Sequence, residues 1–324
     1  MKAMSSLNTA KNLMQVMREL SLDDIREEAE RPPRILVLAA TLEDADAIGQ
    51  NLTGEYRSPY VTSLRLDTSV DRVDAYDAVI LFDPEAQPGS KNLIDSISRK
   101  HPDVVVVPFL SLDPADDLAA RAVRTRILNR QPTKAPSFGR HMPAFVPAAI
   151  KSVIDDTAAA NAQFAALANL PSVVPIFGTL ASVSADFLVL TKNQLLLVYK
   201  VAAIHGRDLH DKAAILREMA PVAGAWFFWR TLAREATTLL PMASGTVPKV
   251  AIAYSGTVAI GRAADYFYRF DEKPSKELLK SFYKTGMESL KKREFHFRNP
   301  KTVDTTFRVY DDRIPEKSDN TDQP

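Results

Sequence analysis

The stretch LANLPSVVPIFGTLASVSADFLVLTKNQLLLVYKVAAIHG, residues 167–206, organises the rest of the chain. Pro171, Pro175 and Gly178 interrupt its beginning, and an apolar run with few charges then continues to Ile204. This pattern predicts one helix of about 25 residues, because the helix-breaking residues stop before it begins. A helix that is apolar nearly all round is expected to be buried in protein or in lipid.

A narrow polar stripe runs along this predicted helix. At about 100° per residue, its members fall on one side: Ser182, Asp186, Asn193 and Lys200. We expect this stripe to serve helix packing, with Asp186 and Lys200 matched by polar groups of neighbouring helices. An unpaired buried charge would be costly.

Composition limits the classes of function. The chain has 324 residues, which suggests two domains, and its formal net charge of +1 argues against a general nucleic-acid binder. It contains no cysteine, so disulfides, thiolate metal sites and thiol nucleophiles are excluded. The first residues lack the uninterrupted apolar core of a secretory signal. We predict no simple membrane-spanning helix, because every long apolar stretch contains Pro or charge.

The first half alternates between strand and helix patterns. After an amphipathic helix in residues 1–30, three apolar runs read as buried strands: RILVLAA (34–40), DAVILFDP (77–84) and VVVVPFL (104–110). SLRLDT is a further strand candidate. Helices are expected between them and after them, at residues 42–54, 90–100 and 112–130, with an Asp113-Pro114 start for the last. This alternation predicts a parallel sheet with crossovers in a Rossmann-like, three-layer domain over residues 31–150.

The second half is predicted to be all-α, so the fold class is α/β plus α. Residues 131–150 are rich in Pro and are interpreted as a linker, or as a last strand and its connection. Helical patterns follow over residues 151–293, including 209–240, 247–270 and 275–293. The polar tail, residues 294–324, is expected to be partly disordered.

No motif for catalysis or cofactor binding is present. The loop LAATLEDADAIG follows the first strand but lacks the Gly and Lys of a phosphate-binding loop, and its three acidic residues would repel phosphate. We therefore expect no cofactor. A nonstandard site would lie at the carboxyl ends of the strands, where the candidates are Thr41, Asp83 and Asp113. His205 and His210 have no ligand spacing, so we expect no metal and interpret their segment as a helix cap.

The order of elements resembles that of an Era-type small GTPase domain whose working residues are missing. In VILFDPEA, Asp83 matches the Asp of a D-x-x-G turn, but Ala86 stands in place of the Gly. In VVVVPFLSLD, Pro108 and Phe109 stand in place of the Asn and Lys of the guanine-reading motif, and Ser111 in place of its Asp.

The helical half, above all residues 167–209, is similar to the uncharacterised helical domain that follows many bacterial Era-like GTPases. The similarity covers residues 150–270. That family is thought to be membrane-associated, and its biochemical activity is unassigned. The resemblance implies a pseudo-GTPase fused to a membrane-leaning helical module.

Three features of the helical half bear on membranes. A stripe of small residues, which allows close helix packing in membranes and in soluble bundles alike, consists of Ala251, Ser255, Ala259 and Ala263. Aromatic residues beside basic ones are typical of a bilayer interface or of a helix end in a core. They are Trp226, Phe227, Phe228, Trp229, Arg230 and Arg234, and then Tyr266, Phe267 and Tyr268. The last helix is rich in lysine, which favours anionic lipid or an ordinary solvated face.

The favoured function is that of a non-catalytic adaptor at the cytoplasmic face of the membrane, or in the cytoplasm. Membrane lipid or a membrane protein is the expected partner, nucleic acid is not, and a homo-oligomer is a further option. Two alternatives stay open. One is a divergent nucleotide hydrolase with a nonstandard site, and the other is a soluble protein that oligomerises through its apolar helices.

Overall fold

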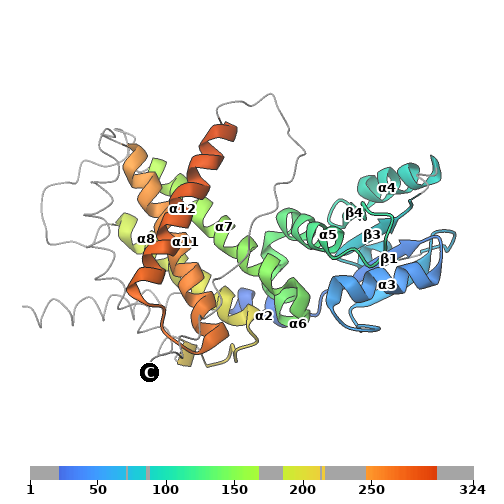
Figure 1. The fold of residues 1–324 in the computed structure, drawn as a ribbon, viewed down its shortest axis with the longest axis horizontal. Helices are drawn as coiled ribbons and strands as arrows, with labels where there is room; N and C mark the ends of the chain where they lie inside the picture. Colours follow the sequence, from blue (N-terminus) through green and yellow to red (C-terminus); the bar gives the residue numbers. More distant parts are fainter. Residues whose placement is uncertain are drawn as a thin grey trace, which may run out of the picture.

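A computed structural model describes residues 22–70, 72–84, 88–167, 185–211, 214–215 and 246–297. An α/β part is joined end to end with a helical part, and helix α5 (Asp117–Arg130) lies between them (Figure 1). This arrangement agrees with the α/β plus α fold class predicted from the sequence.

The α/β part is built on a four-stranded parallel sheet. Its strands are β1 (Ile35–Ala39), β2 (Val61–Arg65), β3 (Ala78–Phe82) and β4 (Val105–Pro108), and their order is β2-β1-β3-β4. Every residue of β1 and β3 is buried, which explains why both read as continuous apolar runs. The strand candidate SLRLDT (63–68) overlaps β2 at residues 63–65, and its last three residues lie beyond the strand.

Helices cover both faces of this sheet. Alternate residues of each strand point to opposite faces. Val37 and Ile80 join the core formed with α3 (Leu42–Thr53) and α5, whereas Leu36 and Val79 face the side of α4 (Pro88–Lys100) and of the short η1 helix (Val73–Ala75).

Local signals set the ends of these helices. Thr41 caps α3, because its hydroxyl accepts a hydrogen bond from the backbone N–H of Asp44 at 3.1 Å. Gly54 ends α3 with a φ of 77°, a left-handed conformation that favours glycine. The predicted Asp113-Pro114 start of α5 is wrong. The N-cap is Asp116, whose carboxylate accepts from the N–H groups of Leu118 and Ala119.

The Pro-rich segment 131–150 is neither a linker nor a strand. It forms η2 (Pro132–Lys134), α6 (Ala135–His141), η3 (Pro143–Phe145) and the start of α7 (Val146–Leu167). Proline is well tolerated in the first turn of a helix, so a series of prolines can begin several short helices in succession. The expected domain boundary at residue 150 therefore falls inside α7.

The helical part consists of α2 (Asp23–Glu30), α7, α8 (Ala185–Ile204), α11 (Thr246–Phe270) and α12 (Lys276–Phe297). Helix α11 is central, because it packs against α7, α8 and α12. Helix α12 continues to Phe297, so the polar tail begins later than residue 294. One hydrophobic cluster runs from Ile35 in the sheet to Tyr283 in α12, so the two parts share a core.

The helix expected after Gly178 corresponds to α8, and residues 179–184 lie outside the described part. In α11 the small residues Ala251, Ser255, Ala259 and Ala263 are all buried. They allow close packing: a Cβ atom added to Gly286 of α12 would lie 2.8 Å from the Cα of Ser255. Among the described residues, no helix combines the length and apolar composition needed to cross a membrane.

Candidate functional site

The sequence-predicted residues Thr41, Asp83 and Asp113 follow β1, β3 and β4, at the carboxyl edge of the sheet. In open parallel sheets, ligands bind at this edge where the chain changes direction between neighbouring strands. Two of the three side chains serve local structure here. Thr41 caps α3, and Asp113 accepts a hydrogen bond from the N–H of Ala115 at 2.8 Å in a turn.

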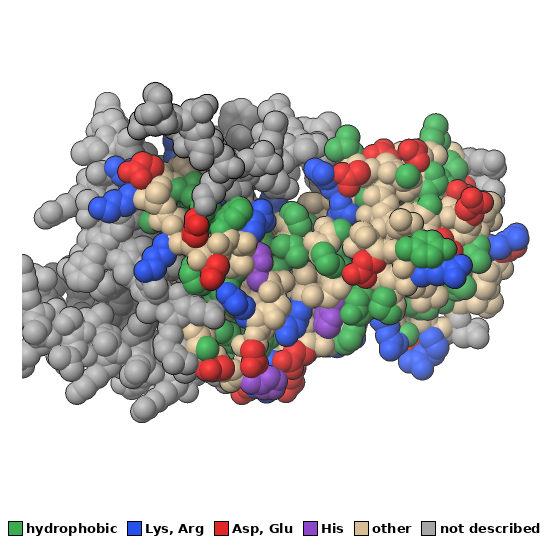
Figure 2. Space-filling model, turned by 60° about the horizontal axis from the view of Figure 1, so that its bottom comes forward, with side chains coloured by type: hydrophobic (Ala, Val, Ile, Leu, Met, Phe, Trp, Pro, Cys, Tyr) green, Lys and Arg blue, Asp and Glu red, His purple; other side chains and the backbone are tan. Residues whose placement is uncertain are grey.

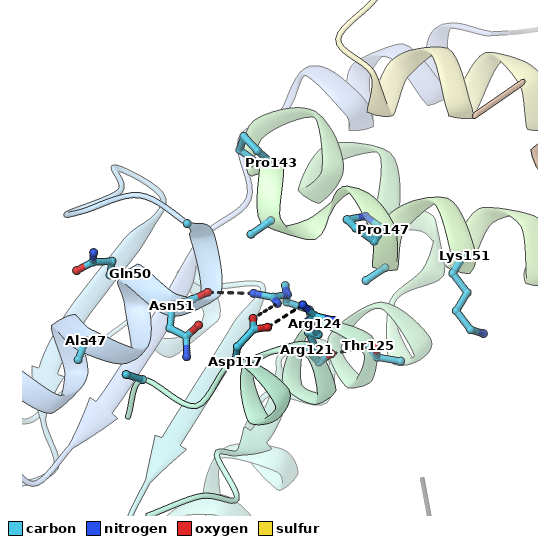
Figure 3. Close-up of a pocket in the computed structure, with 14 residues that line it drawn as sticks. Ala47, Gln50, Asn51, Asp117, Arg121, Arg124, Thr125, Pro143, Pro147 and Lys151 are labelled. Carbon is cyan, nitrogen blue, oxygen red and sulfur yellow. Dashed lines mark hydrogen bonds and ion pairs between the residues drawn. The ribbon is translucent and has the colours of Figure 1, made fainter. Parts of the chain in front are cut away.

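A groove lies elsewhere, between α3, α5 and the start of α7 (Figure 3). It has a volume of about 740 Å³, and Thr41, Asp83 and Asp113 are not among its lining residues. Its polar and charged lining comprises Gln50, Asn51, Asp117, Arg121, Arg124, Thr125 and Lys151. The sequence gives no signal for this groove, because its walls come from segments up to about a hundred residues apart.

Arg124 forms the floor of this groove and is nearly fully buried. Its guanidinium donates to the backbone carbonyls of Asn51 at 3.0 Å and Leu52 at 3.2 Å, in the last turn of α3. It also donates to the carboxylate of Asp117 at 3.4 Å (Figure 3). A cation is favoured at a helix C-terminus, where carbonyl groups lack partners. Burial nevertheless lowers the pKa of Arg124, because the desolvated guanidinium loses contact with water.

The other cations of the groove also have carboxylate partners. Arg121 lies 2.8 Å from Asp117, and Lys151 lies 2.6 Å from Asp155 one turn further along α7. Arg121 and Asp117 remain more than half exposed within their pair, so charged groups still face the groove. The contacts of Arg124 fix α5 against α3.

The chain matches no known protein family, curated protein or solved structure.

The aromatic residues near the end of α11 take part in internal packing. Tyr266, Phe267 and Tyr268 are half-buried, and the ring of Tyr268 contacts His205 and the guanidinium of Arg207. His205 Nε2 lies 2.8 Å from Asp265 Oδ1, so the end of α8 is joined to α11. The other predicted interface residues, Trp226, Phe227, Phe228, Trp229, Arg230 and Arg234, lie outside the described residues.

The predicted polar stripe of α8 contains one residue with a clear role. The Nδ2 of Asn193 donates to Asn161 of α7 at 2.7 Å, as expected for a polar group matched by a neighbouring helix. Lys200 is half-buried, and the side chain of Asp186 lies outside the described part. The segment after α8 forms capped turns, because Asp208 and Asp211 accept from nearby backbone N–H groups.

Helix α12 has one buried face and one lysine-bearing face. Leu279, Phe282, Tyr283 and Gly286 are buried, and α11 lies against this helix. Exposed lysines occur at Lys273, Lys276, Lys280 and Lys284, together with the exposed acids Glu277 and Glu288. The side chains of Lys291, Lys292 and Arg293 lie outside the described residues.

Large exposed hydrophobic residues gather at the carboxyl edge of the sheet. Leu42 follows β1 and is 51% exposed, while Leu110 and Leu112 follow β4 and are 68% and 81% exposed. Sequence reasoning missed them, because a leucine next to a strand has the same appearance in sequence as a leucine of the core. In Figure 2, hydrophobic, acidic and basic side chains are interspersed over the α/β part in the right-hand half.

Proposed function

We propose that the chain is a non-catalytic, peripheral adaptor. Helix α12 binds an anionic membrane surface, and the α/β part binds a partner without using nucleotide. This proposal keeps the interpretation of the α/β part as a pseudo-GTPase, which is based on sequence resemblance. The observation that carries it is the row of exposed lysines on α12.

The lysines of this row are spaced for a common contact. Lys276, Lys280 and Lys284 are four residues apart, so they lie along one side of the helix. The buried face of the helix lies beside this row, which fixes the orientation of the row relative to the rest of the protein. Each lysine close to an anionic leaflet contributes about 1 kcal/mol to binding. Glu277 and Glu288 reduce this attraction, and the basic residues 291–293 in the sequence add to it.

An exposed aromatic residue precedes the row in the sequence. Phe270 ends α11 at 46% exposure, three residues before Lys273, and its ring lies 4.8 Å from that of Tyr266. An aromatic ring beside lysines is suited to the headgroup region of a bilayer. Peripheral binding also agrees with the lack of a spanning helix among the described residues.

Co-sedimentation with vesicles tests this proposal. The full chain should bind vesicles of phosphatidylcholine and phosphatidylserine and should not bind phosphatidylcholine alone. A triple variant, Lys276→Gln with Lys280→Gln and Lys284→Gln, should lose most of the binding. Salt near 1 M should release the wild type, because the screening length then falls to about 3 Å.

The matched control removes the same charge from the α/β part. Arg72, Arg99 and Lys100 are exposed, and their replacement by Gln should leave vesicle binding unchanged. Equal losses in both triple variants would mean that net charge, rather than α12, decides binding. Release by detergent but not by salt would contradict the peripheral mode.

Nucleotide binding is the test that separates this function from a divergent hydrolase. The loop after β1 and the first turn of α3 have no Lys and carry Glu43 and Asp44, so phosphate groups would meet negative charge. We expect calorimetry with GTP or ATP in the presence of Mg²⁺ to give no saturable heat. Stoichiometric micromolar binding would favour the enzyme instead.

A further inference from the structure

We propose that the carboxyl edge of the sheet is the partner-binding site, and that it binds a basic amphipathic segment of another protein. The inference rests on the proposed adaptor function and names the place and chemistry of its partner contact. The edge is remote from α12, because α12 lies in the helical part and α3 runs back toward that part from this edge (Figure 1).

Apolar side chains of this edge are exposed without a local reason. Leu42, Leu110 and Leu112 follow two strands of the same parallel sheet, so topology places them at one edge. The neighbouring Phe82 and Phe109 are buried and pack edge to face, with ring centroids 6.0 Å apart. The leucines thus extend an aromatic core outward into solvent. Clustered exposed apolar residues with a polar rim mark interaction surfaces.

The rim around these leucines is mainly acidic, and the exposed Arg65 at the end of the neighbouring strand β2 is paired with Asp67 at 2.9 Å. The described segments 40–44, 83–84 and 110–116 contain five acidic residues and no Lys or Arg: Glu43, Asp44, Asp83, Asp113 and Asp116. Three of these acids are used in capping and turns, since Asp44 pairs with Thr41, Asp113 holds a turn and Asp116 caps α5. Those roles account for carboxylates at these positions, but they do not account for the exposed leucines.

Charge complementarity identifies the occupant. A partner needs apolar side chains to cover the leucines and cations to match the rim, and both occur together on a basic amphipathic helix. An anionic lipid surface or a phosphate ligand would meet five negative charges here. This edge therefore differs in its chemistry from the lysine face of α12.

Fluorescence anisotropy on the full chain tests the site with a defined probe. The probe is a short labelled helical peptide of leucine and lysine, with all leucines on one face. We expect saturable binding that weakens as salt rises, and no binding of the matching leucine and glutamate peptide. Leu110→Ser with Leu112→Ser should weaken binding about tenfold or more, because the lost apolar contact lies at its centre.

Two further variants separate contact from general effects. Tyr56→Ser removes an equally exposed apolar side chain beyond the C-terminus of α3 and should leave the affinity unchanged. Glu43→Gln with Asp113→Asn keeps side-chain shape and should reduce both affinity and its dependence on salt. The lysine variants of α12 should still bind the peptide, and the leucine variants should still bind vesicles. Loss of peptide binding and loss of vesicle binding can then be observed independently of each other.

Three results would overturn the inference. Peptide binding that is unchanged by the leucine substitutions would place the contact elsewhere. Equal binding of the acidic peptide would remove the role of the rim. Self-association of the wild type that is lost in the leucine variant, measured by sedimentation, would mean that a second copy of this chain covers the edge.

Discussion

Asn161 donates a hydrogen bond from its Nδ2 to the hydroxyl of Thr257 across 2.8 Å, and its side chain is completely buried. The same residue accepts from Asn193, so one amide of α7 joins α8 and α11 inside the helical core. Thr257 in turn donates to the carbonyl of Ala253. Buried polar groups need such partners, because an unmade hydrogen bond costs about 1–3 kcal/mol.

This network predicts the effect of Asn193→Leu. The substitution leaves the Oδ1 of Asn161 without its donor and should lower the free energy of unfolding by about 1–3 kcal/mol, measured by urea denaturation. Lys192→Leu is the matched control, because Lys192 is exposed one position earlier, and it should change little. The double variant, Asn193→Leu with Asn161→Leu, should lower the free energy of unfolding by less than the sum of the two single changes. Strict additivity would contradict the network.

Arg124 is predicted to hold the α3–α5 junction. Arg124→Met removes donors from the carbonyls of Asn51 and Leu52 and should destabilise the protein by about 2 kcal/mol. Arg124→Lys should recover only part of this, because an ammonium cannot reach both carbonyls and Asp117 in the geometry of a guanidinium. Thermal unfolding provides the measurement. Arg121→Met removes an exposed ion pair and should cost less than about 1 kcal/mol.

Gly286 is predicted to be essential for the contact between α11 and α12. In an isolated helix, Gly→Ala is favourable by about 1 kcal/mol. Here Gly286→Ala should instead destabilise by about 1–3 kcal/mol, because the new Cβ would lie 2.8 Å from the backbone of Ser255. Denaturant unfolding shows whether the substitution raises or lowers the free energy of unfolding. Ser281→Ala, on the exposed face of the same helix, is the control and should leave the free energy of unfolding almost unchanged. A gain in stability for Gly286→Ala would contradict the prediction, because it would mean that α12 shifts without cost.

Protonation of His141 should lower the free energy of unfolding in mild acid. Burial lowers its pKa, although hydrogen bonds to the backbone of Glu30 and Ala29 oppose this effect, and its ring packs 5.4 Å from that of Tyr60. The folded state therefore binds a proton less readily than the unfolded chain, whose histidine has a pKa of about 6.5.

The sign of the pH effect follows. Stability from neutral His141 is present above about pH 6.5 and declines as the pH falls below that value. His141→Gln cannot be protonated, so its unfolding free energy should change less between about pH 7 and pH 5 than that of the wild type. The difference between the two proteins isolates His141 from the other histidines. If the free energy of unfolding depended on pH in the same way in both proteins, protonation of His141 would not oppose folding.

Local patterns in the sequence determine much of this structure. The apolar runs at β1, β3 and β4 are long enough to be buried on both faces, and the helix after β1 begins and ends at local signals, Thr41 and Gly54. The same periodic reasoning located α11 and α12 nearly to their ends. It failed for residues 131–150, since prolines that suggested a linker instead lie in the first turns of short helices.

Tertiary structure alone decides which side chains become partners and which stay exposed. Arg124 meets a carbonyl 73 residues away, and His205 meets a carboxylate 60 residues away, because packing brings the two helices together in each case. Leu110 and Leu112 look no different in sequence from the core leucines. They are exposed because no neighbouring element covers the carboxyl edge among the described residues. Burial depends on the elements that surround a residue, and a sequence pattern specifies only the face on which that residue lies.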